Sequence, residues 1–268
     1  MGHRARGTLA PLVSHILRLQ SRGASVWGLA LGLYAAALVA SFLSFGDPRQ
    51  MEQIMQAYPK GMLEAFGISD MGTIQGYLAG QVFNLAPLAL AFFPILSLSG
   101  AIAGAEERGT LDVLLGNPLP RWQLVVGSFV ATALSLLGIV AGMGAVMWVT
   151  AVLVEVDLPL AASGEAVLNL WPTCVFFGAL ALLCSALFHR RSLATAVPAV
   201  VLFAMYLIDA LGRVSEDLEG LRSASVFYYY GSAIENGIEW FFFAGVTAVA
   251  LLLVALAAFA FTRRDIYA

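Results

Sequence analysis

Six long apolar stretches, nearly free of charged residues, dominate this chain. Each contains the roughly 20 mostly apolar residues that a helix needs to cross the hydrocarbon core of a bilayer. Of the 268 residues, 60% are apolar and only 12% are charged, whereas soluble domains carry about 25% charged residues. We therefore predict an all-α membrane protein with a single transmembrane domain over residues 1–268. Its six spans are expected at about 23–46, 81–105, 120–154, 166–188, 192–212 and 239–262.

The basic residues are distributed unevenly between the two sides of such a bundle. With the N-terminus inside, ten of the fourteen lie in the two terminal segments and in the loops after the second and fourth spans. Loops rich in Lys and Arg stay on the cytoplasmic side, so both termini are predicted to be cytoplasmic. The first span is too long for the apolar part of a signal peptide, and we interpret it as a retained helix. The high alanine and glycine content favours a bacterial cytoplasmic membrane.

Three segments outside the spans show patterns of their own. Apolar residues recur with helical spacing in 8–22, which predicts an amphipathic helix on the inner membrane surface. The same spacing in 51–66 predicts a helix that rests on the outer surface. The loop 213–237 contains the aromatic run Val-Phe-Tyr-Tyr-Tyr-Gly at 226–231. Because aromatic rings suit the headgroup boundary, we expect a re-entrant outer hairpin between the fifth and sixth spans.

The loop between the second and third spans has the pattern of a short, stiff helix. Thr110 can cap its N-terminus, and Asp112 is favourable in its first turn. Pro118 prevents its continuation. Such a helix suits docking into a groove on another protein; the alternative is a simple re-entry turn whose leucines touch lipid. The candidate docking residues are Glu106, Glu107, Arg108, Gly109, Thr110, Leu111, Asp112, Leu114, Leu115, Pro118 and Arg121.

The stretch 106–127 resembles the type 2 family of ABC (ATP-binding cassette) transporter permeases. That family carries the pattern E-x-x-x-G-T-L-E-x-L-L-x-x-P-[IL]-x-R-x-x-[IL]-x-x-G-K. Asp112 stands here where the family commonly has Glu, and Ser128 stands where it commonly has Lys. The closing residues 261–266 are also similar to the usual end of such permeases. The residues that match the pattern are Gly109, Thr110, Leu111, Leu114, Leu115, Pro118, Leu119, Arg121, Leu124 and Gly127.

This resemblance implies both a fold and a set of partners. In similar permeases, the segment before the first span is a connecting helix, and the loop between the second and third spans is the coupling helix that contacts the ATPase. Short re-entrant helices lie on the outer side between the fifth and sixth spans. The resemblance also implies a second permease subunit, since one six-helix chain forms half of the usual pore. Export is the usual direction of transport in the family.

The sequence contains no ATP-hydrolysing motif. A P-loop needs a Gly-Lys pair to bind phosphate, and this dipeptide does not occur. ATP and Mg²⁺ are therefore expected on a separate ATPase subunit, with no cofactor and no catalytic residue on this chain. Cys174, Cys184 and the three histidines show no metal-ligand spacing. No basic domain indicates a nucleic-acid partner.

Polar residues inside the spans suggest contacts between helices. Gln81 and Asn84 can line a cavity or bond to neighbouring helices, and we favour the second interpretation. Asp209, near the end of the fifth span, is interpreted as an interface residue that faces lipid headgroups. Pro87, Pro94 and Pro198 are expected to kink their helices.

The cargo and the class of protein follow less directly. Because the spans offer no fixed charge to hold an ion or a sugar, we expect an apolar, amphipathic or lipid-like cargo, or a drug. Two other classes remain open. One is a permease-like membrane sensor or scaffold; the other is a membrane-embedded enzyme, for which no acid–base or metal motif is visible.

Overall fold

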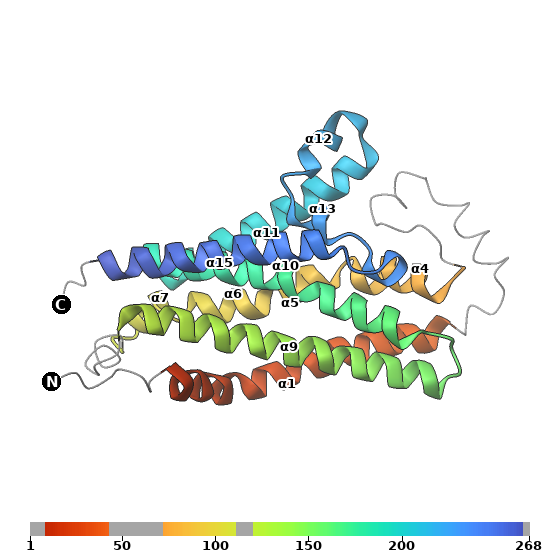
Figure 1. Ribbon diagram of the computed structural model, residues 1–268, viewed down its shortest axis with the longest axis horizontal. Helices are drawn as coiled ribbons and strands as arrows, with labels where there is room; N and C mark the ends of the chain where they lie inside the picture. The colour runs from red at the N-terminus through yellow and green to blue at the C-terminus, as the bar shows by residue number, and fades with distance from the viewer. Residues whose placement is uncertain (1–8, 43–71, 111–119, 265–268) are drawn as a thin grey trace.

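The computed structural model describes residues 9–42, 72–110 and 120–264. In these ranges every regular element is a helix, and six helices are long and apolar enough to cross a membrane. They form an elongated bundle, and its first helix begins at the same end at which its last helix stops (Figure 1). The expected six-span, all-α fold is therefore confirmed for this part of the chain. The side of the membrane on which the termini lie stays a prediction.

Four spans are long helices whose bounds lie close to the expected ones. Pro120 and Pro159 directly precede two of them in extended conformation, and proline, which lacks a backbone N–H, is well suited to such a position. Pro172 and Pro198 lie inside two of the helices, which continue through them. The four helices are α9 (Arg121–Leu153), α10 (Leu160–Leu187), α11 (Arg191–Val214) and α15 (Trp240–Arg263).

The second span is assembled from short pieces. Pro87 and Pro94 lie in two of these pieces, where the missing proline N–H interrupts the hydrogen bonds of a regular helix. The part long enough to span runs from Ile74 to Ser99, somewhat earlier than the predicted 81–105. The pieces are α4 (Ile74–Leu78), the π-helix η2 (Ala79–Phe83), α5 (Ala86–Leu90), α6 (Phe92–Ser99) and, after a break, α7 (Ala103–Glu107).

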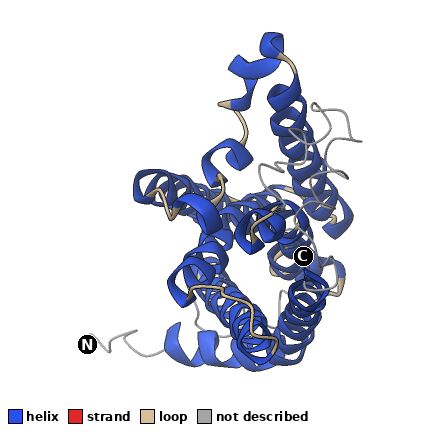
Figure 2. Ribbon diagram, turned by 90° about the vertical axis from the view of Figure 1, so that its right-hand side faces the viewer, coloured by secondary structure: helices blue, strands red, loops and turns tan. Residues whose placement is uncertain are grey.

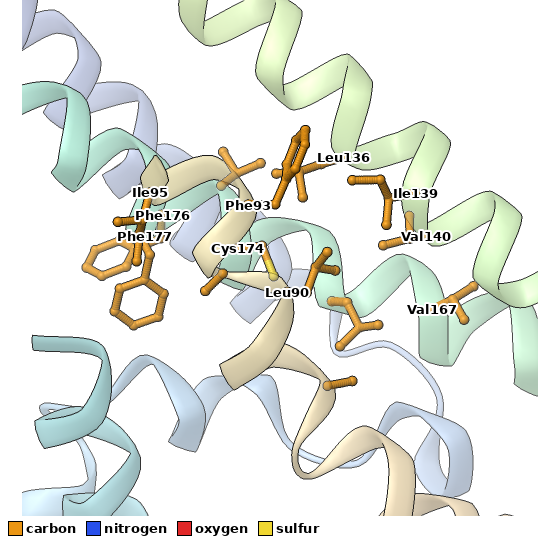
Figure 3. Packing of buried hydrophobic residues seen from close by; sticks show 14 of the residues in the cluster. Leu90, Phe93, Ile95, Leu136, Ile139, Val140, Val167, Cys174, Phe176 and Phe177 are labelled. Atoms are coloured by element: carbon orange, nitrogen blue, oxygen red, sulfur yellow. The ribbon is translucent and has the colours of Figure 1, made fainter. Parts of the chain in front are cut away.

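α10 is the central helix, and it packs against α6, α9, α11 and α15. In an apolar stretch of 18 residues of α10, 72% of the residues are buried, compared with 17% in the corresponding stretch of α15. Side chains such as Leu90, Phe93, Leu136 and Phe177 form the core around it (Figure 3). The outward faces of α11 and α15 carry large exposed apolar side chains, which suits surfaces that contact lipid or another subunit.

α1 (Leu9–Phe42) is one continuous helix of 34 residues. The sequence predicted two elements here, a surface helix at 8–22 and a span at 23–46. In Figure 2, which looks along the bundle, the first turns of α1 run sideways towards the N-terminus. The two expected elements are therefore two parts of one helix, and the pattern of apolar residues does not show where the first part ends and the second begins.

The first turns of α1 pack on the start of α9. At Gly127 an added Cβ would come within 2.8 Å of Leu12 Cδ2, so the glycine permits this close contact. Further along, Gln20 donates a hydrogen bond to the Thr132 hydroxyl (3.0 Å) and accepts one from Ser135 (2.9 Å). The expected amphipathic face is therefore used to hold α1 against α9.

Short helical pieces connect α11 to α15. α13 packs against α10, α11 and α15, and Phe227 is buried there beside the rings of Phe177 and Tyr206. The aromatic run is thus part of the packed structure, while its entry into the membrane stays a prediction. The surface helix expected at 51–66 lies outside the described residues. The connecting pieces are η3 (Glu216–Leu218), α12 (Glu219–Arg222), α13 (Val226–Tyr230) and α14 (Ala233–Asn236).

Candidate functional site

The loop between the second and third spans begins after α7 and ends at α9, at the end of the bundle where α1 begins (Figure 1). We call this end of the bundle the loop end. The structure describes Glu106, Glu107, Arg108, Gly109 and Thr110 before the loop and Arg121 after it. Outside the described part of the chain lie the other candidate residues, Leu111, Asp112, Leu114, Leu115 and Pro118. The short helix that they are expected to form therefore stays a prediction.

The Glu106 carboxylate joins the ends of three helices. One oxygen lies 2.8 Å from Nδ1 of His189, which follows α10, and the other lies 2.7 Å from Nη2 of Arg264, which follows α15. Arg264 also contacts His189 and donates to the Ala186 carbonyl at 3.1 Å. The side chain of Arg264 is only 12% exposed, so this ion pair is better shielded from water than a surface pair.

Glu107 contacts the start of α11. Its carboxylate accepts a hydrogen bond from the backbone N–H of Arg191, the first residue of α11, at 2.8 Å. The first N–H groups of a helix have no partner within the helix and carry a partial positive charge. An acidic side chain at this position satisfies one of these donors. The Arg191 guanidinium in turn donates to the Leu96 carbonyl at 3.3 Å, which connects α11 to α6.

Arg121, the first residue of α9, anchors the other end of the loop. Its Nη1 donates to the Arg264 carbonyl at 2.6 Å and to the Phe261 carbonyl at 3.5 Å. Its guanidinium also lies over the Phe261 ring, 5.8 Å from the ring centroid. The last carbonyls of a helix lack partners within that helix, so Arg121 completes the end of α15. Both ends of the loop are therefore held against the end of the last span.

The residues just before the loop turn the chain out of α7. Gly109 has a φ of +64°, a left-handed conformation that glycine adopts readily at a helix end. The Thr110 hydroxyl donates to the Ala105 carbonyl at 3.1 Å. Its expected role as the cap of the next helix involves residues outside the described ones. Arg108, Gly109 and Thr110 are all exposed.

Ser185 of α10 supports this arrangement from inside the bundle, and the sequence analysis did not identify it. Its hydroxyl accepts hydrogen bonds from the N–H groups of Ile102 (3.3 Å) and Ala103 (2.9 Å). It also donates to the Ser99 carbonyl at 3.0 Å. These backbone groups lose their helical partners at the break between α6 and α7, and buried backbone groups need partners. One serine on a buried helix has no distinctive pattern, so only the contact identifies it.

Asp209, at the opposite end of the bundle, corrects an expectation. The residue is only 3% exposed, so the prediction that it faces headgroups is wrong. Its oxygens pair with Arg213 Nη2 at 2.6 Å and with Arg222 Nε at 3.1 Å. The spacing of four residues between Asp209 and Arg213 was a usable sequence signal. Arg222, from α12, had no such signal.

A cavity of about 260 Å³ lies between η2, α11, α12 and α13, and its lining includes Asp209, Arg213 and Arg222. Asn84 and Tyr206 also line it, and the Asn84 amide donates to the Tyr206 hydroxyl at 3.4 Å. Asn84 therefore does both of the things that its sequence position suggested, since it bonds to a neighbouring helix and also lines a cavity. In the described ranges no cluster of three or more side chains is arranged to hold a metal ion.

Comparisons with known proteins agree with this architecture. Residues 18–266 match the family model described as "ABC-2 family transporter protein". The probable ABC transporter permease protein NosY of Stutzerimonas stutzeri is 38% identical over 82 residues. That alignment covers 29% of this chain and 30% of the relative, so less than a third of either protein is compared. The family and the six apolar helices together identify a multi-pass membrane protein. Since the family model covers nearly the whole chain, the chain belongs to the ABC-2 family of transporter proteins.

Proposed function

We propose that this permease is driven by a separate ATPase subunit that docks on the loop 106–121, and that it exports an apolar, amphipathic or lipid-like compound. The observation that carries the proposal is the anchoring of the loop at both ends. Glu106 and Glu107 connect its start to the ends of α10, α11 and α15, and Arg121 connects its end to α15. A displacement of the loop is therefore passed to several spans at once.

The surface for the ATPase is provided by the loop itself. Its leucines are expected to form an apolar face, and the described residues just before them, Arg108 to Thr110, are exposed and accessible to a partner. Truncating an apolar anchor in a docking pocket commonly costs about 2 kcal/mol or more. An exposed charge pair contributes about 0–1 kcal/mol. The leucines are therefore the residues on which docking depends.

The buried charges favour ATP over an ion gradient as the energy source. An ion-coupled transporter uses an ionisable group inside the membrane that binds and releases its ion. In the described part of the chain Asp209 is the buried acidic residue, and arginines already occupy both of its oxygens. ATP and its Mg²⁺ would be bound by the ATPase subunit, because this sequence contains no P-loop.

The outward faces of the spans support the remaining parts of the proposal. Large apolar side chains are exposed along α1, α11 and α15, and a second permease subunit, identical or related, would cover part of this surface. Apolar helix surfaces of this kind suit contact with a cargo that has a large apolar part. Export is proposed because it is the usual direction of transport in the family. The proposed location is a bacterial cytoplasmic membrane.

The test combines two leucine truncations. Leu111→Ala with Leu115→Ala should release the ATPase from the affinity-tagged chain, or should make ATP hydrolysis insensitive to amphipathic drugs, while the six spans still insert. Asp112→Asn in the same loop is the matched control and should change both readouts little. Co-purification of the ATPase and drug-stimulated hydrolysis are the measurements.

Three outcomes are distinguishable. Normal ATPase binding together with normal stimulation in the double variant would show that the loop is only a turn. If the wild-type complex hydrolyses ATP but moves no cargo into inverted vesicles, the chain is a sensor or a scaffold. Loss of either readout in a correctly inserted double variant, with a normal Asp112→Asn control, supports the proposal.

A further inference from the structure

The cavity beside Asp209 contains hydrogen-bond donors that lack acceptors. The Nε atom of Arg213 is buried, and no other atom of the described structure accepts its hydrogen. The Tyr206 hydroxyl accepts from Asn84, which leaves its own proton available for a further acceptor. Both side chains line the cavity. A buried donor without an acceptor destabilises a protein, so this cavity is suited to a ligand that supplies oxygen atoms.

The charge of the cavity favours an anion. Its described lining contains two arginines and one acid, Asp209, and both Asp209 oxygens are occupied. The lining therefore carries one excess positive charge. Glu235 is not part of the lining, and its carboxylate accepts a hydrogen bond from the Ser232 hydroxyl at 2.7 Å. A singly charged anion would neutralise the lining.

The arginines are held in place before any ligand arrives. The stem of Arg222 passes directly over Gly212, where an added Cβ would stand 2.3 Å from Arg222 Cγ. The guanidinium of Arg222 also lies over the Tyr228 ring, 5.1 Å from its centroid. Arg213 is fixed by its 2.6 Å contact with Asp209 on the same helix. Donors that are ordered in advance bind a ligand at a lower entropic cost.

We propose that this cavity binds a phosphodiester group of a lipid-like molecule. Guanidinium groups recognise phosphate oxygens through paired hydrogen bonds, and a phosphodiester carries the single negative charge that the lining lacks. Ala79, Phe83 and Phe227 add apolar wall beside the charges. The volume of about 260 Å³ is smaller than the roughly 300–1,000 Å³ of pockets for drug-sized ligands, so the headgroup enters and the hydrocarbon chains stay outside.

This site does not depend on the proposed coupling to an ATPase, because it lies at the opposite end of the bundle from the loop. It can therefore be tested on the purified full-length chain alone. In detergent containing equal amounts of phosphatidylglycerol and diacylglycerol, which has the same chains but no phosphodiester, native mass spectrometry should show preferential retention of phosphatidylglycerol. Inorganic phosphate at high concentration is the second probe. If it displaces the lipid, the phosphate group itself is what the cavity recognises.

Two variants decide between binding and coincidence. Arg213→Gln removes the buried donor and its charge and should reduce retention of phosphatidylglycerol about tenfold, the scale of a hydrogen bond to a charged group. Tyr206→Phe keeps the ring and should also reduce retention severalfold, because it removes one hydrogen-bond donor to the charged phosphodiester. Arg263→Gln removes one exposed positive charge at the loop end and should leave retention unchanged.

Equal retention of the two lipids by the wild-type chain would overturn the proposal. So would unchanged retention in both Arg213→Gln and Tyr206→Phe. If Arg213→Gln fails to fold, Tyr206→Phe alone decides, because it removes a single oxygen atom from the cavity wall.

Discussion

The Glu106 carboxylate and the Arg264 guanidinium lie 2.7 Å apart, although 158 residues separate them in the sequence. The backbone carbonyl of Arg264 also accepts a hydrogen bond from Arg121, at 2.6 Å. One residue at the end of the last span therefore holds both the start and the end of the loop 106–121. A force on this loop cannot move one of its ends without acting on Arg264.

Glu106→Gln should weaken this connection while the shape of the side chain is kept. We expect a loss of about 1 kcal/mol in the free energy of unfolding and a severalfold lower stimulation of ATP hydrolysis by cargo. Hydrolysis by the purified complex and thermal unfolding in detergent measure the two effects. Asp157→Asn removes an exposed carboxylate between α9 and α10 and serves as the control. Unchanged stimulation in Glu106→Gln would mean that Arg264 does not transmit the motion.

Ser185→Ala should destabilise the break between α6 and α7. The change removes an acceptor from two backbone N–H groups and a donor from one carbonyl, all close to the buried serine. Leaving such buried groups without partners costs about 1–3 kcal/mol, which should appear as a lower midpoint of thermal unfolding. Thr173→Val on the same helix is the control. Thr173 is buried and has no side-chain hydrogen bond within the described residues. Equal effects of the two changes would argue against a special role for Ser185.

Gly212→Ala should disrupt the contact between α11 and α12. The new Cβ would stand 2.3 Å from Arg222 Cγ and 3.0 Å from the Leu218 carbonyl oxygen. Overpacking of this kind typically costs about 1–3 kcal/mol, measurable by thermal unfolding in detergent. Gly142→Ala, which meets no atom within 4 Å, should be neutral or stabilising by up to about 1 kcal/mol, since alanine favours helix. Equal stability of Gly212→Ala and Gly142→Ala would show that the Arg222 side chain moves aside without cost.

A reporter that is active only in the cytoplasm tests the orientation of the chain. Fused after Ala268 it should give a signal, and fused after Asp157, between α9 and α10, it should be silent. The reason is the excess of Lys and Arg in the segments assigned to the inside. A silent fusion at Ala268 with an active one at Asp157 would invert the predicted topology.

Local properties of the sequence were enough to predict the spans. In a bilayer every backbone group must be satisfied within its own segment, so an apolar run of about 20 residues becomes a helix wherever it is placed. This is why the bounds of α9, α11 and α15 agree closely with the expected ones. The loop was identified in the same way, because turn residues, a possible cap and a recurrent motif are neighbours in the chain.

The tertiary structure alone decided which polar side chains meet. The sequence predicted that Asp209 is an interface residue, but α12 brings Arg222 within hydrogen-bond distance of it. Ser185 has no distinctive sequence pattern, and its role depends on the break in the second span beside it. The contact between Glu106 and Arg264 depends in the same way on how the ends of α7 and α15 come together. The physical reason is that a buried polar group takes its partner from whatever the packing brings within about 3 Å. Helical periodicity records only which face of a helix is apolar, so the choice of partner is made by the fold.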